Sequence, residues 1–281
     1  MSPSSLNAGA YSGTITISST NASNSPQTVN VTLTVTAAPK PLPVLAAVVN
    51  AASYFPGALA PGEIVTLGGT NVGPTTPAGL HVTSGRVDTL LAETRVLFDG
   101  IPAPLTYVSS TQINAVVPYG VGGRVSTRVE VEYQGVKSSP LVYQVTTSVP
   151  GIFTPDASGR GPGAILNQNF SLNSNANPAS RGAYVMIYAT GEGLVTPAVA
   201  DGSVTPGAEP FPRPLLPVTV TIGGKHAQVA YAGAAPGFVA GVLQLNVRVP
   251  DDLAVSGVTV VPVVVTVGAA SSQPNVTLAV Q

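Results

Sequence analysis

Residues 61–74 read Pro61-Gly62-Glu63-Ile64-Val65-Thr66-Leu67-Gly68-Gly69-Thr70-Asn71-Val72-Gly73-Pro74, and residues 181–194 read Arg181-Gly182-Ala183-Tyr184-Val185-Met186-Ile187-Tyr188-Ala189-Thr190-Gly191-Glu192-Gly193-Leu194. The two stretches share a glycine, two apolar residues, a threonine and a second glycine at the same spacing. In each, a run of β-branched and apolar residues leads into glycines, which is typical of a strand that ends in a turn. An internal repeat of this kind predicts two copies of one fold.

The repeat continues and covers most of the chain. Three further segments align, namely residues 96–107 with 220–231, 112–118 with 244–250, and 135–139 with 268–272. Asp99-Gly100 and Gly223-Gly224 are predicted two-residue hairpin turns, because these residues adopt positive φ at low cost. Each copy then has about seven strands, a usual size for an immunoglobulin-like sandwich. We predict an all-β fold with tandem immunoglobulin-like β-sandwiches over residues 39–152 and 153–281, after a partial N-terminal strand pair.

Residues 1–38 contain two runs of alternating polarity joined by a connector that is rich in asparagine and serine, so we expect a hairpin. In the second run, one face carries Val29, Val31, Leu33 and Val35. The hairpin resembles the C-terminal end of BACON-type immunoglobulin-like modules of secreted bacterial proteins. That resemblance implies that residues 1–38 are the terminal hairpin of a truncated immunoglobulin-like domain.

An isolated hairpin is marginally stable in water. Two alternatives stay open for this one: it packs on the next domain, or its open edges over residues 11–36 pair with another copy of the chain by strand addition. The second alternative predicts self-association, because the hairpin strands carry no charged residue that would discourage edge pairing.

The composition excludes several classes of protein. Charged residues make up 8% of the 281 residues and the net charge is −1, so no basic patch is present for nucleic acid or an anionic membrane. The absence of cysteine excludes disulfides, thiolate metal sites and a cysteine nucleophile. The N-terminus does not read as a signal peptide, and the longest apolar run, residues 258–267, is too short to span a membrane.

The order of strands and turns in each copy resembles the IPT/TIG class of immunoglobulin-like domains. A closer resemblance, to the Solibacter-type C-terminal domain of secreted acidobacterial proteins, rests on residues 50–53, 59–65, 107–114, 150–153, 188–193, 231–237 and 243–250. It implies an extracellular or cell-surface location and, as partners, other modules of a longer parent chain. It carries over no catalytic residue and no cofactor.

Candidate catalytic and metal-binding residues are few. A Ser-His-Asp site would need His81 or His226, and no Gly-x-Ser-x-Gly motif accompanies either. Asp251 and Asp252 could help to hold Ca²⁺ with carbonyl oxygens, or cap a turn. Glu63 and Glu192 stand at non-equivalent places in the repeat, and we expect them not to form a common site.

Exposed aromatic rings are the usual platforms for sugars. Tyr54, Phe55 and Tyr119 lie in expected loops and are the candidates for a glycan site; Phe153, Phe211 and Phe238 lie in similar stretches. The alternative is that these rings fill the sandwich ends or the junction between the copies.

The sequence thus predicts a protein that is not an enzyme. We expect a non-catalytic structural or interaction module of a secreted or cell-surface bacterial protein, able to assemble by strand addition. A carbohydrate-binding module is the alternative, and a hydrolase of unusual design is the third hypothesis. We predict no bound cofactor.

Overall fold

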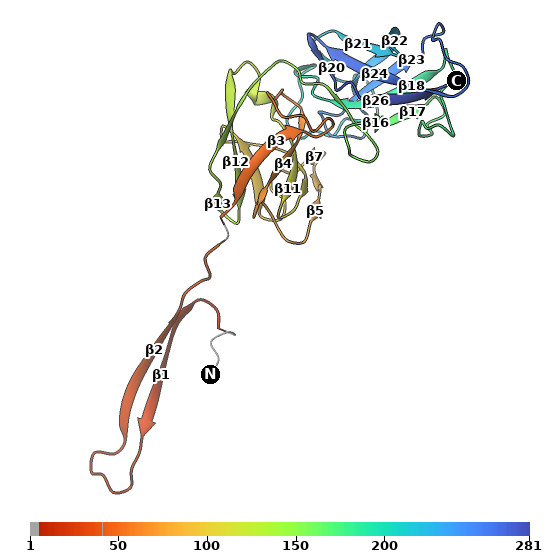
Figure 1. The fold of residues 1–281 in the computed structure, drawn as a ribbon. Helices are drawn as coiled ribbons and strands as arrows, with labels where there is room; N and C mark the ends of the chain where they lie inside the picture. The colour runs from red at the N-terminus through yellow and green to blue at the C-terminus, as the bar shows by residue number, and fades with distance from the viewer. Residues whose placement is uncertain (1–5, 41) are drawn as a thin grey trace. The chain divides into compact units, whose positions relative to one another are not determined.

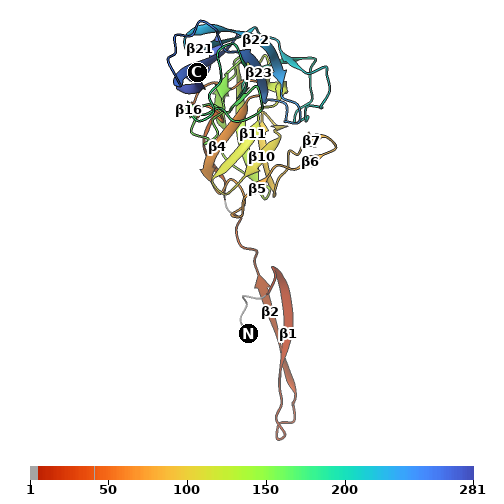
Figure 2. The same cartoon turned by 90° about the vertical axis from the view of Figure 1, so that its right-hand side faces the viewer.

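The computed structural model describes residues 6–40 and 42–281. The described chain is almost entirely β-structure, with one short 3-10 turn at Tyr119–Val121, and this confirms the predicted all-β fold. The chain divides into two units, Met1–Pro41 and Leu42–Gln281 (Figures 1 and 2). No helix among the described residues has the length and hydrophobicity needed to cross a bilayer.

The first unit is a single antiparallel hairpin of β1 (Gly9–Ile17) and β2 (Gln27–Val35). Its register runs without a shift from Gly9 opposite Val35 to Ile17 opposite Gln27. Because side chains alternate along a strand, one face collects the apolar residues and the other collects serine, threonine and asparagine. The exposed apolar side chains are Tyr11, Ile15, Ile17, Val29, Val31 and Leu33.

In the second unit, the first copy is a sandwich of two sheets. One sheet has the order β3 (Val44–Asn50), β4 (Ile64–Thr70), β11 (Gln112–Val116), β10 (Leu105–Val108), β5 (Ala78–Gly79). The other has the order β13 (Val136–Lys137), β12 (Ser126–Tyr133), β8 (Thr94–Phe98), β9 (Ile101–Pro102), with β14 (Leu141–Gln144) beside β12. A short hairpin, β6 (Val82–Thr83) and β7 (Arg86–Val87), stands apart. The core between the two sheets includes Leu67, Val96, Phe98, Ile113 and Val131.

The second copy forms one continuous sheet that folds over its own core. Its order is β15 (Gly151–Ile152), β18 (Tyr184–Thr190), β23 (Leu243–Arg248), β22 (Lys225–Ala234), β21 (Val218–Ile222), β24 (Thr259–Val267), β26 (Val276–Val280), β16 (Gly161–Pro162). β17 (Ile165–Asn167) joins β18, β25 (Ala270–Ser271) joins β24, and β19 (Val195–Thr196) pairs with β20 (Arg213–Pro214).

Equivalent strands of the two copies pair in the same register. Ile113 lies opposite Leu67 in the first copy, and Leu245 lies opposite Ile187 in the second. The Gln-x-Asn motif has one structural role in both, because its two side chains point to the same face and are hydrogen-bonded there. The amide nitrogen Nε2 of Gln112 donates to Oδ1 of Asn114 at 3.0 Å, and Gln244 donates to Asn246 at 2.9 Å.

The copies differ where the first carries prolines. Pro102 and Pro104 separate β9 from β10, since proline has no N–H for a ladder and ends a strand. The aligned positions in the second copy are His226 and Gln228, and there β22 runs unbroken and pairs with both β21 and β23. The break between β9 and β10 thus coincides with the two prolines that the second copy lacks.

The predicted alignment of the last hairpin is off by one residue. Ser138 N donates to Val131 O and Val131 N donates to Ser138 Oγ; Ser272 makes the same two bonds with Val265. Ser138 is therefore equivalent to Ser272, whereas the sequence match paired it with Ser271. Aligning the glycines of the two turns caused the slip, because those glycines occupy different turn positions.

The two copies share a third, smaller apolar core of Ile64, Val116, Ala235 and Val242. Backbone bonds also cross between the copies, from Val87 N to Gly202 O at 2.8 Å and from Val204 N to Gly85 O at 2.9 Å. We call this contact the interdomain seam. It explains why residues 42–281 form one compact unit.

Candidate functional site

The three predicted glycan-site aromatics have different surroundings. Tyr54 and Phe55 are neighbours and are 38% and 56% exposed. Tyr119 is half-buried, and a Cβ placed on Gly62 would lie 2.7 Å from its ring. The Tyr119 ring therefore covers the backbone at Gly62, which leaves Tyr54 and Phe55 as the exposed aromatic pair among the three.

The predicted calcium ligands are engaged in ion pairs. Asp251 accepts two bonds from the guanidinium of Arg248 at 2.6 and 3.1 Å, and Asp252 accepts one from Lys225 at 2.9 Å. The hydrogen bond from Lys225 lowers the pKa of Asp252 below its usual value. Among the described residues no group of three histidines or carboxylates could hold a metal ion.

The histidines are placed on the surface rather than in a catalytic array. His81 Nδ1 lies 2.7 Å from Asp88 Oδ2 and 3.4 Å from the hydroxyl of Thr83. Both partners approach the same ring nitrogen, whereas in a Ser-His-Asp site the hydroxyl and the carboxylate contact opposite nitrogens of the ring. His226 is exposed on β22, where it pairs with Thr221.

We expected Glu63 and Glu192 not to form a common site because their repeat positions differ, but the structure brings them close to each other. Both lie in the interdomain seam, at 0% and 2% exposure, and the charge of Glu192 acts on Glu63. The repeat alignment could not show this, because it compares equivalent positions within each copy. The seam instead joins the start of β4 to the end of β18, as the bond from Ile64 N to Thr190 Oγ1 at 2.8 Å demonstrates.

Glu63 is buried with two neutral donors. Its Oε1 accepts from Nδ2 of Asn50 at 2.9 Å, and its Oε2 accepts from the backbone N–H of Ala60 at 2.8 Å. Burial raises the pKa of Glu63 to about 8; the two hydrogen bonds oppose the rise and the nearby Glu192 adds to it. Glu63 is therefore mostly protonated at neutral pH.

Glu192 is less well satisfied than Glu63. Its Oε2 has no hydrogen-bond partner although the atom is buried. Burial raises the pKa of Glu192 to about 7. The pKa of the Tyr119 phenol is also raised well above its usual value, first by burial and then by the charges of Glu192 and Asp201. The seam thus gathers acidic groups, and no ion pair of the described residues neutralises either glutamate.

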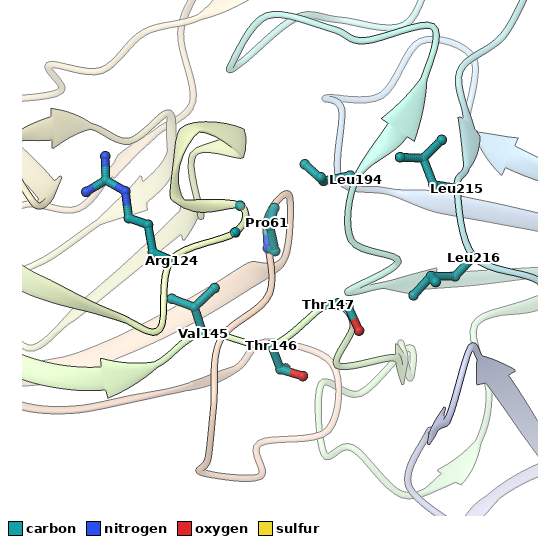
Figure 3. Close-up of a pocket in the computed structure, with 10 residues that line it drawn as sticks. Pro61, Arg124, Val145, Thr146, Thr147, Leu194, Leu215 and Leu216 are labelled. Carbon is teal, nitrogen blue, oxygen red and sulfur yellow. The ribbon is translucent and has the colours of Figure 1, made fainter.

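Beside this seam lies an apolar cleft of about 410 Å³ that both copies line (Figure 3). Its walls include Pro61 and Val145 from the first copy and Leu194, Leu215 and Leu216 from the second. Arg124 stands at its edge, and its guanidinium points away from the leucines and pairs with Asp99 at 2.7 Å. The cleft offers apolar contact and no free charge.

Comparison with known proteins finds a family match for the first copy. Residues 49–145 match the IPT/TIG domain. The match confirms an IPT/TIG-like domain in this part of the chain, and as an immunoglobulin-like fold without enzymatic activity it agrees with the prediction that the chain is not an enzyme. A search of curated proteins finds no match to the sequence.

Two solved structures show distant likenesses. The full extracellular region of plexin A4 aligns with 85% of this chain and 18% of its own length, at 14% identity and a TM-score of 0.28. The endo-fucoidan hydrolase MfFcnA4 from glycoside hydrolase family 107 aligns with 98% of this chain and 34% of its own length, at 12% identity and a TM-score of 0.20. The chain spans about a third or less of these structures, and neither likeness assigns a function.

Proposed function

We propose that this chain is a non-catalytic structural and interaction module of a secreted or cell-surface bacterial protein. In this proposal the joined IPT/TIG-like copies form the body, and the N-terminal hairpin binds a β-sheet partner by strand addition. The observation that carries the proposal is a regular hairpin with two unpaired edges. Other modules of a longer parent chain are the further partners, as the resemblances to the Solibacter-type and BACON-type families imply.

The edges of the hairpin are open to pairing. β1 pairs only with β2 among the described strands, so one side of each strand presents free N–H and C=O groups. Natural edge strands are usually protected by charges, prolines or bulges. Neither strand has a charge, a proline or a register shift, and the first charged side chain of the sequence is Lys40. Such an edge favours an added strand.

A second copy of the chain fits the hairpin best, because an uncharged surface is matched by an uncharged partner. The apolar face also carries a hollow of about 550 Å³ where Gly13 stands opposite Val31, between Tyr11 and Ile15. At nine residues a strand, the face measures roughly 300 Å². Stacking two faces would bury roughly 600 Å², less than a stable interface needs, so edge pairing must add to it.

Light scattering tests the self-association. The full chain should exceed its monomer mass of 28.1 kDa as concentration rises, and residues 42–281 should remain monomeric. The shorter form is a fair comparison, because all three described core clusters lie within it. Equal, monomeric behaviour of both forms would contradict self-assembly.

A pair of neighbouring substitutions separates face stacking from edge pairing. Val31→Lys places a charge on the apolar face, and Asn30→Lys places the same charge on the polar face of the same strand. If the faces stack, V31K abolishes association and N30K retains it. If association rests on edges alone, the two variants lose it equally.

A broad screen for hydrolytic activity tests the proposal that the chain is not catalytic. An activity that stays with the purified chain, and that a single substitution removes, would overturn the proposal. Substitution of His81 or Glu192 would show whether either takes part.

Carbohydrate binding is the second candidate, and the exposed neighbours Tyr54 and Phe55 favour it. A glycan array with the wild type and Phe55→Ala tests it. Phe170→Ala is the matched control, because Phe170 is 74% exposed and lies in the other copy. Binding that F55A loses and F170A keeps would support a glycan site, and an array without hits would remove this candidate.

A further inference from the structure

Two carboxyl groups from different copies are buried together in the interdomain seam. Glu63 belongs to the turn that precedes β4, and Glu192 lies two residues beyond the end of β18. Both are essentially without solvent contact, and Glu192 keeps an unpaired buried oxygen. A buried carboxylate without a partner is costly, so this arrangement requires a structural explanation.

The residues around the two acids connect the copies through hydrogen bonds. Asn50 Nδ2 donates both to Glu63 and, at 3.0 Å, to Val149 O in the segment that joins the copies. Next to Glu192, Thr190 Oγ1 accepts from Ile64 N and donates to Gly241 O at 2.7 Å. The acids therefore lie among the bonds that hold the seam closed.

The backbone around Glu192 is in close contact with the connecting segment. A Cβ on Gly191 would lie 1.8 Å from Val149 O, and one on Gly193 would lie 1.9 Å from Thr147 O. The loop that carries Glu192 therefore packs directly against the connecting segment, so a separation of the two copies would also expose the buried carboxyl to water. Hydration of Glu192 and opening of the seam are thus coupled.

Among the described residues, the titratable groups that interact with the two acids are themselves acidic. The charge of Glu192 acts on Glu63 and on the phenol of Tyr119, and Asp201, whose Oδ1 accepts from Tyr119 N at 2.7 Å, acts in turn on Tyr119. None of the ion pairs in the described part of the chain involves Glu63 or Glu192. A proton on each carboxyl is therefore the available means of neutralising it.

We propose that Glu63 and Glu192 form a proton-operated lock between the two immunoglobulin-like copies. With both carboxyls neutral the seam stays closed. When the protons leave, two like charges remain in a buried junction, and the seam opens to hydrate them. This device is independent of the hairpin and of self-association.

The sign of the pH effect follows from linkage. Both pKa values in the folded chain, about 8 and about 7, lie above the ordinary value of 4.5. Between pH 4.5 and 8 the closed seam holds more protons than the open one, so closure weakens as pH rises. The contribution of the protons to closure is complete below about pH 4.5, falls as pH rises, and is gone above about pH 8. Within that range the opening constant rises up to about tenfold per pH unit for each proton released.

Fluorescence transfer between the copies tests the lock. The natural chain has no cysteine, so Ser139→Cys and Ser256→Cys introduce one dye site on each copy at exposed positions. Transfer efficiency should be constant from pH 5 to 6 and change between pH 7 and 9. The same labels in Glu63→Gln/Glu192→Gln should show no change, and Glu130→Gln, outside the seam, should behave as the wild type.

Infrared spectroscopy provides a readout that needs no variant. The wild type at pH 6 should show the band of a buried, protonated carboxyl, and the band should fade by pH 9. Glu192→Gln alone, which replaces one acid by a neutral side chain of the same size, should lose part of it. The lock would be overturned if the transfer efficiency did not change with pH, or if the double variant changed as much as the wild type. The absence of the infrared band at pH 6 would also overturn it.

Discussion

Two strands with nearly the same pattern have opposite environments. β2 in the hairpin alternates Val29, Val31 and Leu33 with polar residues, and these three side chains are 50%, 43% and 43% exposed. β24 in the second copy alternates Val263, Val265 and Val267, and these are completely buried. The difference teaches that alternation defines an apolar face without deciding whether anything covers it.

The cause lies in the neighbours of each strand. β24 pairs with β21 on one side and with β26 on the other, and the apolar core of the second copy covers its inner face. β2 pairs with β1 alone among the described strands. If strand addition supplies the missing neighbours, the apolar side chains of β2 should become buried in the assembly, as those of β24 are.

The largest contrast is expected from one substitution made in both strands. Val265→Lys buries a charge with no partner in the core and should lower the free energy of unfolding by more than about 4 kcal/mol. Val31→Lys should leave the unfolding of residues 42–281 unchanged. Chemical denaturation of both variants measures the contrast, and a small effect of V265K would mean that this core is loosely packed.

Glycines offer the next contrast, inside the second unit. Gly191→Ala should destabilise it by about 3 kcal/mol, because φ is +81° and the new methyl would collide with Val149 O. Gly68→Ala is the control: no atom lies within 4 Å of its Cβ position. Thermal unfolding of both variants should show a loss only for G191A, and an equal loss would contradict the tight seam.

A smaller and equal effect is expected from the two serines that the repeat makes equivalent. Ser138→Ala and Ser272→Ala each leave a buried N–H, of Val131 and Val265, without its side-chain acceptor. Each should cost about 1 kcal/mol. Ser271→Ala should cost less, because its hydroxyl bonds to Thr266 at an exposed position. A larger cost for S271A than for S272A would restore the glycine-based alignment.

The smallest effect is expected from removing the hairpin. Residues 42–281 contain all of the described core clusters, so deletion of residues 1–41 should leave their melting temperature unchanged at low concentration. Differential scanning calorimetry checks this. A clear fall in melting temperature would show that the hairpin packs on the rest of the chain, which was the other alternative for it.

Much of the fold could be predicted because its signals are local. The turns at Asp99-Gly100 and Gly223-Gly224 lie where residue type predicts them, with positive φ at both positions of each turn. Gln112 and Asn114 are two residues apart, so alternation alone puts them on one face. The seam could not be predicted in this way. Glu63 and Glu192 meet through packing between unlike ends of two equivalent strands, and no spacing in the sequence records that contact.

The sequence by itself determined the period of the strands, the turns, the duplication and the absence of charge in the hairpin. These are properties of neighbouring residues, set by backbone geometry and side-chain alternation. Only the tertiary structure decided that β24 is buried, that β2 is exposed, and that two acids share a buried junction. Burial depends on which distant segments come into contact, and the free energy of a carboxyl depends on that burial.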